Sequence, residues 1–133
     1  MTYSIRPLII VLAALSLAAC MQDVPASADR NVRAPQATVV GEPVNCIETR
    51  QIDGTNVYDD YTIDFEMRDN TIYRNTLPNR CGGLGFGQRF GYDLRGTTRL
   101  CSTDIIRVLD SDGRMIGSCG LGQFVPVTVA DAG

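Results

Sequence analysis

The clearest alternation of side chains in the sequence lies between Val57 and Met67. Large apolar or aromatic residues occupy every second position of its second half: Tyr61, Ile63, Phe65 and Met67. The positions between them are polar: Thr62, Asp64 and Glu66. A period of two residues, with β-branched and aromatic side chains, predicts a strand with one buried face and one solvent-facing side.

The next segment predicts a hairpin. Residues 68–71 form a polar turn, and residues 72–77 are expected to return as a strand. A two-residue loop would set Phe65 opposite Arg74, whereas a three-residue loop sets Met67 against Tyr73 and Glu66 against Arg74. We favour the second register because it keeps apolar residues on one face and forms a cross-strand ion pair on the other. Asn70 or Thr71 would then take a left-handed backbone conformation.

Further short strands are expected on both sides of this hairpin, over residues 45–52, 90–94, 100–101, 104–109, 115–119 and 124–127. Apolar residues on both faces of 104–109 predict a central strand. Ser111-Asp112-Gly113 predicts a three-residue hairpin loop, and Pro126 indicates an edge or closing position. The pattern predicts an all-β fold, a small antiparallel barrel or sandwich of about seven or eight short strands, with no helix after residue 20.

The amino-terminal pattern is different. An apolar run from Leu8 to Ala19 follows a head whose only charged side chain is Arg6. The run is shorter than the roughly 20 residues of a transmembrane helix and is typical of a helical signal peptide, residues 1–19. It ends in Leu17-Ala18-Ala19-Cys20, small residues before a cysteine, as a lipoprotein signal peptidase requires. Cys20 is therefore expected to carry the lipid, a diacylglycerol thioether with a further acyl chain such as palmitate on the amino group. A chance cysteine in an ordinary signal peptide and an uncleaved anchor are the alternatives.

Residues 20–42 lack hydrophobic periodicity and predict a lipidated, flexible tether, so that the β domain spans 43–133. Met21, which stands where Asp would be a retention signal in Gram-negative lipoproteins, points to the outer membrane, facing the periplasm.

The composition excludes several classes of catalytic and binding site. The chain has 133 residues, no His, and a net charge of −3. Without His there are no Ser–His or Cys–His nucleophile pairs and no imidazole metal ligands. The mild negative charge and the lack of a basic run argue against nucleic-acid binding. We expect no metal or other cofactor.

Four cysteines remain beyond Cys20: Cys46, Cys81, Cys101 and Cys119. Four cysteines in a small exported domain indicate two disulfides with three possible connectivities. We favour Cys46–Cys119 and Cys81–Cys101, with the other pairings open. The absence of C-x-x-C spacing disfavours zinc and thioredoxin-like sites.

Four groups of residues could form a site, and each also has a structural explanation. The acidic residues Asp59, Asp60, Asp64 and Glu66 could form a hydrolytic carboxylate pair, but surface and structural roles are favoured. The glycine-rich stretch 81–87 has Gln88 where a dinucleotide motif needs glycine, and residues 110–113 fit a turn better than a calcium loop. Tyr58, Tyr61 and Tyr73 could form a binding face or fill a core that has no Trp.

Several short motifs lie between Cys46 and Val127: Cys46-Ile47, Asp59-Asp60, residues 73–77 leading to Cys81, residues 100–104, and Cys119. In these motifs the chain resembles a family of short, four-cysteine proteobacterial lipoproteins classified as a domain of unknown function. The resemblance implies architecture and location, and no activity.

We therefore expect a non-enzymatic envelope lipoprotein that binds an envelope protein or a cell-wall component. The alternative is an inhibitor of a periplasmic or host hydrolase, which a protruding loop at residues 82–89 would favour. A hydrolase using Asp59, Asp60 or Asp93 is the least favoured interpretation.

Overall fold

The computed structural model describes residues 33–130 and confirms the all-β prediction. The described residues form ten strands: β1 (Ala37–Val39), β2 (Cys46–Glu48), β3 (Ile52–Val57), β4 (Thr62–Met67), β5 (Ile72–Thr76), β6 (Phe90–Tyr92), β7 (Arg99–Cys101), β8 (Ile105–Leu109), β9 (Met115–Gly120) and β10 (Phe124–Val129). The expected first strand, residues 45–52, is shorter than predicted: β2 ends at Glu48, a 3-10 turn follows over Thr49–Gln51, and β3 begins at Ile52. One short helix, α1 (Leu84–Gly87), occurs in the glycine-rich stretch, where we had expected none.

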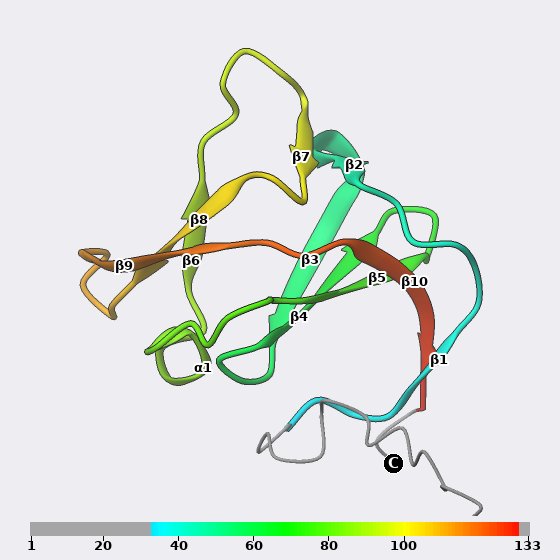
Figure 1. The fold of residues 1–133 in the computed structure, drawn as a ribbon, viewed down its shortest axis with the longest axis horizontal. Coiled ribbons are helices and arrows are strands. Elements are labelled where there is room, and N and C mark those ends of the chain that lie inside the picture. Colours follow the sequence, from blue (N-terminus) through cyan, green and yellow to red (C-terminus); the bar gives the residue numbers. More distant parts are fainter. Residues whose placement is uncertain (1–32, 131–133) are drawn as a thin grey trace, which may run out of the picture.

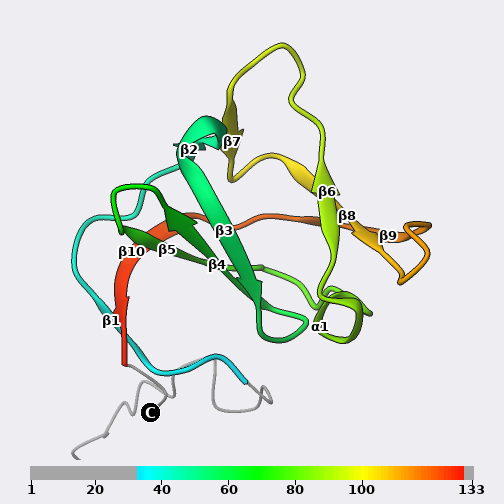
Figure 2. The ribbon, with the colours of Figure 1, turned by 180° about the vertical axis from the view of Figure 1, so that it is seen from behind.

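The strands form three antiparallel sheets with the orders β1-β10-β5-β4-β3, β2-β7 and β6-β8-β9. The chain crosses from the three-stranded to the five-stranded sheet through β9 and β10, which follow one another across the molecule (Figure 1). Seen from behind, β3 and β6 stand at neighbouring ends of their sheets above α1 (Figure 2). Strand β8 is central in its sheet, as its apolar residues predicted.

The β4–β5 hairpin differs from the preferred register. Asp64 lies opposite Arg74 and Phe65 opposite Tyr73, a shift of two positions from the prediction. The loop is three residues long but begins at Arg68, since the Met67 N–H donates to the Thr71 carbonyl. Asn70 takes the left-handed conformation, with φ of 68°, as expected. Because the shift is even, every side chain keeps its predicted face, but Arg74 gains a different partner.

Ordered structure begins earlier than residue 43. Within the predicted tether, Ala37–Val39 pairs with Val127–Val129 of β10. Strand β10 is therefore internal, between β1 and β5, although Pro126 had predicted an edge or closing position. Pro126 is tolerated because its carbonyl accepts from Val40, just beyond β1, so its nitrogen points to the same side and no bond to β5 is lost.

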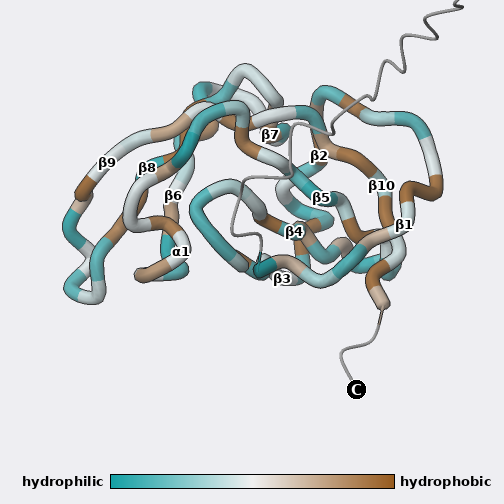
Figure 3. The backbone as a smooth tube through the Cα atoms, turned by 60° about the horizontal axis from the view of Figure 1, so that its bottom comes forward, coloured by the Kyte–Doolittle hydropathy of each residue, from teal (hydrophilic) through white to brown (hydrophobic). Residues whose placement is uncertain are grey.

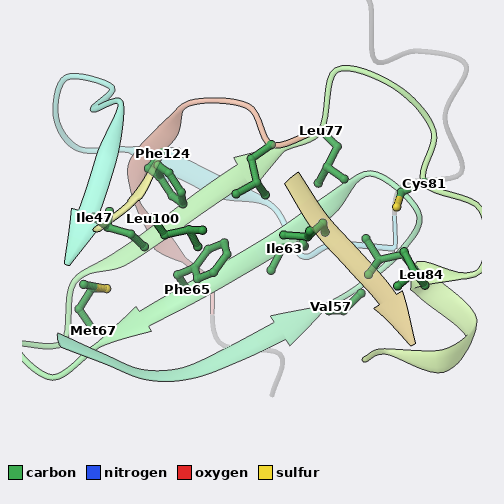
Figure 4. Close-up of a cluster of buried hydrophobic side chains, with 13 residues drawn as sticks. Ile47, Val57, Ile63, Phe65, Met67, Leu77, Cys81, Leu84, Leu100 and Phe124 are labelled. Atoms are coloured by element: carbon green, nitrogen blue, oxygen red, sulfur yellow. The ribbon is translucent and has the colours of Figure 1, made fainter. Parts of the chain in front are cut away.

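The core is built from all three sheets. Its buried hydrophobic residues are Ile47, Val57, Ile63, Phe65, Met67, Leu77, Cys81, Leu84, Leu100, Ile106, Val108, Leu121 and Phe124. Phe65 lies near the centre of this cluster, with ring centroids 5.4 Å from Phe124 and 6.1 Å from Phe90 (Figure 4). Hydrophobic segments run along the strands, whereas the β8–β9 turn is hydrophilic (Figure 3).

A buried amide holds β10 against β5. The Asn75 side chain is fully buried and bonds both backbone groups of Gly122, accepting from the N–H at 2.8 Å and donating to the carbonyl at 2.7 Å. A Cβ at Gly122 would lie 2.3 Å from the Thr76 carbonyl oxygen, so only glycine allows this approach. Both polar groups of the amide are satisfied, as burial requires.

The four cysteines form two disulfides, Cys46–Cys101 and Cys81–Cys119. The favoured pairing of Cys46 with Cys119 and Cys81 with Cys101 is therefore wrong. Cys46 and Cys101 are direct partners in the β2–β7 pair, with Cα atoms 4.0 Å apart, so no other pairing satisfies this sheet. The second bridge ties the segment before α1 to β9.

Candidate binding surfaces

The three tyrosines singled out in the sequence do not form one face. Tyr73 packs against the core from β5. Tyr58 follows β3 on the opposite side of the sheet, where the guanidinium carbon of Arg74 lies 5.8 Å from its ring centroid. Tyr61 lies in the turn before β4, its N–H donating to Asp59 and its carbonyl accepting from Leu77. Of the two roles considered for these residues, Tyr73 takes the core-filling one, and Tyr58 lies on the other side of the sheet from it.

The outer face of the five-stranded sheet carries a buried ion pair. The Arg74 Nε and Nη2 donate to the two carboxylate oxygens of Asp64, each at 2.8 Å. Asp64 is only 1% exposed, which corrects its expected place on a solvent-facing side. The hydrogen bonds that Arg74 donates to Asp64 raise the pKa of the guanidinium above its ordinary value, so Arg74 stays charged. A bidentate geometry is what makes a buried pair of this kind tolerable.

Arg74 also holds residues 33–36, here called the N-terminal strap, against this face. Its Nη1 donates to the Pro35 carbonyl at 2.7 Å, and the Arg33 N–H donates to Asp59 Oδ2 at 3.0 Å. Both contacts are made to the backbone of the strap. They explain how Asp64 is covered: the strap, Arg74 and the Tyr58 side chain lie over a position that alternation alone placed in solvent.

Tyr58 is affected by this burial. Removal from solvent, followed by the negative charge of Asp64, raises the pKa of the Tyr58 hydroxyl above its ordinary value of 10.0. The nearby Arg74 opposes this shift without reversing it. The phenol is thus held neutral, which suits a structural role beside the ion pair.

The neighbouring carboxylates at the β3–β4 turn serve as backbone caps. Asp59 accepts from Tyr61 and Arg33, and Asp60 accepts from the Gly85 N–H at 2.9 Å and from Arg80. A Cβ at Gly85 would meet the Asp59 Cα at 2.8 Å, so the glycine lets α1 seat on this turn. The structural interpretation of the acidic cluster is the one these contacts support.

The remaining members of the acidic set are also paired. Glu66 accepts from the Asn56 side chain at 2.6 Å, and Asp93 pairs with Arg107 on β8. Within residues 33–130, no three His, Cys, Asp or Glu side chains come together in a group that could hold a metal ion.

A groove of about 330 Å³ opens between the two sheets, lined by Thr55, Gln88, Arg89, Phe90 and Leu109. Thr55 comes from the last strand of the five-stranded sheet and Phe90 from the first of the three-stranded sheet. Sequence reasoning missed this groove because it depends on which sheets lie side by side. The local sequence signal is Gln88, a bulky residue directly after a glycine-rich segment. The structure gives it a left-handed backbone, with φ of 52°.

Lipidation at Cys20 and the signal peptide concern residues outside those that the structure describes. No helix over residues 33–130 has the length and apolar character needed to cross a bilayer.

Comparison with known sequences identifies one relationship. Residues 1–132 match the model of a family described as a family of unknown function (DUF6491). No curated protein and no solved structure matches the chain.

Proposed function

Since the chain belongs to DUF6491, a family of unknown function, we propose a role for it from its own residues: a lipid-anchored, non-enzymatic binding protein of the cell envelope. Its membrane would be the outer membrane, with the β domain facing the periplasm, and its partner a protein or wall component of the envelope. Neither nucleic acid nor a cofactor has a place in this proposal.

The observation that carries the proposal is which cysteines are paired and which one is left. The two disulfides use four of the five cysteines in the chain, and Cys20 is the fifth. Paired cysteines support an oxidising compartment outside the cytoplasm. A left-over cysteine that ends an apolar segment after Leu17-Ala18-Ala19 supports lipid attachment, because the thiol is the group that receives the lipid.

Mass spectrometry of the native membrane-extracted protein tests the anchor. Cleavage after Arg30 by trypsin would release residues 20–30 as the amino-terminal peptide, which we expect to carry a diacylglycerol and one acyl chain. A Cys20→Ala variant should lose the modification and the membrane association. An unmodified peptide, or a mature chain that begins elsewhere, would contradict the anchor.

The binding role is tested by photo-crosslinking in living cells. The chain has no Lys, so a photoreactive residue is a better probe than an amine-reactive reagent. We would place it at Phe86, the most exposed large hydrophobic residue described at 98%, with Arg95 on a distant loop as the matched control. Capture of wall or assembly components at position 86, and not at 95, is expected. Failure to capture any envelope component would contradict the binding role.

Phe86 also favours a second candidate, an inhibitor of a hydrolase. The ring projects from α1, which Cys81–Cys119 and the Asp60–Gly85 bond hold in place. A rigid loop with an exposed aromatic tip is a suitable anchor for an enzyme's cleft. Capture of a single stoichiometric enzyme at position 86 would select this role over the scaffold.

A further inference from the structure

The two sheets end beside the groove with unpaired backbone edges. Strand β3 ends the five-stranded order and β6 ends the three-stranded order, so each has a strand neighbour on one side only among the described residues. The groove between them holds about 330 Å³, near the lower end of the range for ligand pockets.

The backbone direction of β3 follows from one hydrogen bond. The Tyr58 N–H donates to the Thr62 carbonyl, so residue 58 faces β4. In an antiparallel pair the N–H and C=O of a residue point to one side, and this side alternates along the strand. Asn56 therefore faces β4 as well, whereas Thr55 and Val57 direct their backbone groups away from β4. Thr55 is also a lining residue of the groove.

The same reasoning orients β6. The Leu109 N–H donates to the Arg89 carbonyl at 3.0 Å, so residue 89 faces β8. Gly91 then faces β8, and Phe90 and Tyr92 direct their N–H and C=O groups away from it. The groove is thus bordered by backbone donors and acceptors on both sides.

Gln88 occupies part of the space that a strand would fill. Its side-chain amide donates to the outward-facing carbonyl of Val57 at 3.3 Å, a long hydrogen bond. It does so from a left-handed backbone conformation that costs energy for a residue other than glycine. The Gln88 amide is therefore a weak partner for the edge of β3, and a peptide strand can displace it.

Resting on the proposed binding function, we propose that this groove binds an extended peptide segment of the partner protein. The segment adds as a strand to the free edge of β3, displaces the Gln88 amide, and faces β6 on its other side. Phe90 and Leu109 would receive an apolar side chain. Arg89, whose guanidinium makes one long bond to the Ser111 carbonyl at 3.3 Å, would receive an acidic one.

A phage-displayed library of linear peptides of about ten residues, longer than a typical strand, is the probe. It is selected on the full-length, oxidised protein in detergent micelles, and enriched peptides are synthesised for fluorescence anisotropy. We expect enriched sequences with alternating apolar residues and one Asp or Glu. Methylation of alternate backbone nitrogens in the peptide should abolish binding, because strand addition depends on those N–H groups.

Three variants locate the binding edge. Thr55→Pro removes one outward N–H without touching the bonds to β4, and should weaken binding about tenfold. Gln88→Ala removes the competing amide and should tighten binding. Arg89→Glu should reverse the preference from acidic to basic peptides, whereas Arg95→Glu, the same change on the exposed 93–98 loop, should leave it unchanged. The Gln88 and Arg89 variants keep the test valid if Thr55→Pro does not fold.

The proposal fails if no peptide is enriched, or if bound peptides are insensitive to the Gln88 and Arg89 changes. It also fails if sedimentation shows that β3 edges pair two copies of the chain instead. These results would leave the proposed function intact, because lipid at Cys20 and crosslinking through position 86 are measured independently of the groove.

Discussion

The β4–β5 and β8–β9 hairpins turn by the same chemistry but sit in opposite surroundings. Each has a three-residue loop with a left-handed third residue, Asn70 with φ 68° and Gly113 with φ 79°. In each an aspartate braces the turn, Asp69 accepting from the Thr71 N–H and Asp110 from the Asp112 N–H. The local sequence therefore specifies both turns to the same degree.

The two hairpins differ in what covers their strands, as β4 of the first and β9 of the second show. Five of the six β4 residues are buried, since the core lies on one face and the Arg74–Asp64 pair with the N-terminal strap on the other. None of the six β9 residues is buried, and Met115 and Ile116 are more than half exposed. Since the turns are alike and the cover is not, we expect the stability of each hairpin to depend more on what covers its second face than on its turn.

The largest loss of stability is expected when the ion pair that covers the outer face of β4 is removed. Arg74→Met leaves the Asp64 carboxylate buried without its partner, and should lower the free energy of unfolding by about 3–5 kcal/mol. The control is Arg107→Met, which breaks the exposed pair with Asp93 on the other sheet and should change it by less than about 1 kcal/mol. Urea unfolding of the oxidised variants measures both. Equal losses in the two variants would end the distinction between the hairpins.

A smaller loss of stability is expected when the disulfide that holds β9 is removed. Replacement of Cys81 and Cys119 by Ser should lower the free energy of unfolding by about 2–4 kcal/mol. Because the bridge is attached to β9, amide exchange should increase there while β4 stays protected. Exchange that rises equally in β4 and β9 would show that the two hairpins open as one unit.

The smallest expected effect is on how the stability of the fold changes with pH. The raised pKa of Tyr58 means that the folded state holds the phenolic proton more tightly than the unfolded state. This contribution is complete below the unfolded pKa of about 10 and is lost as the pH rises through the folded pKa. The chain has no Lys whose titration would overlap with that of Tyr58 in this range. Urea midpoints from pH 8 to 11 should fall less steeply in Tyr58→Phe than in the unaltered protein; parallel curves would refute the assignment.

Much of the fold could be predicted because it is encoded over short distances. Alternation placed Ile63, Phe65 and Met67 in the core, and the turn residues placed Asn70 and Gly113 at left-handed positions. Register was harder, because a shift of two residues keeps the same faces and changes only the partners. Both Asp64 and Glu66 could accept from Arg74 on charge alone, and the sequence did not reveal that Arg74 would pair with Asp64 while also binding the strap.

Long-range features could not be predicted. The pairing of β2 with β7, which joins Cys46 to Cys101, brings together residues 55 positions apart and has no local signal. The short Ala37–Val39 strand forms because β10 offers it an edge, and its own sequence had suggested a tether. The groove between β3 and β6 could not be predicted for the same reason. It forms where the two sheets lie side by side, and the sequence of neither strand indicates this arrangement.

Under the proposed lipid anchor at Cys20, the docked strap also limits how far the domain can stand from the bilayer. Between Cys20 and Arg33 the chain has thirteen steps, which extend to at most about 45 Å, whereas a segment free as far as Ala37, where β1 begins, would reach about 60 Å. Breaking the hydrogen bonds of Asp59 and Arg74 to the strap would therefore lengthen the free segment between Cys20 and the domain, although the chain itself is unchanged. In the proposed anchored form, Arg74 of the charged pair thus helps to set the radius of the volume that the domain can search.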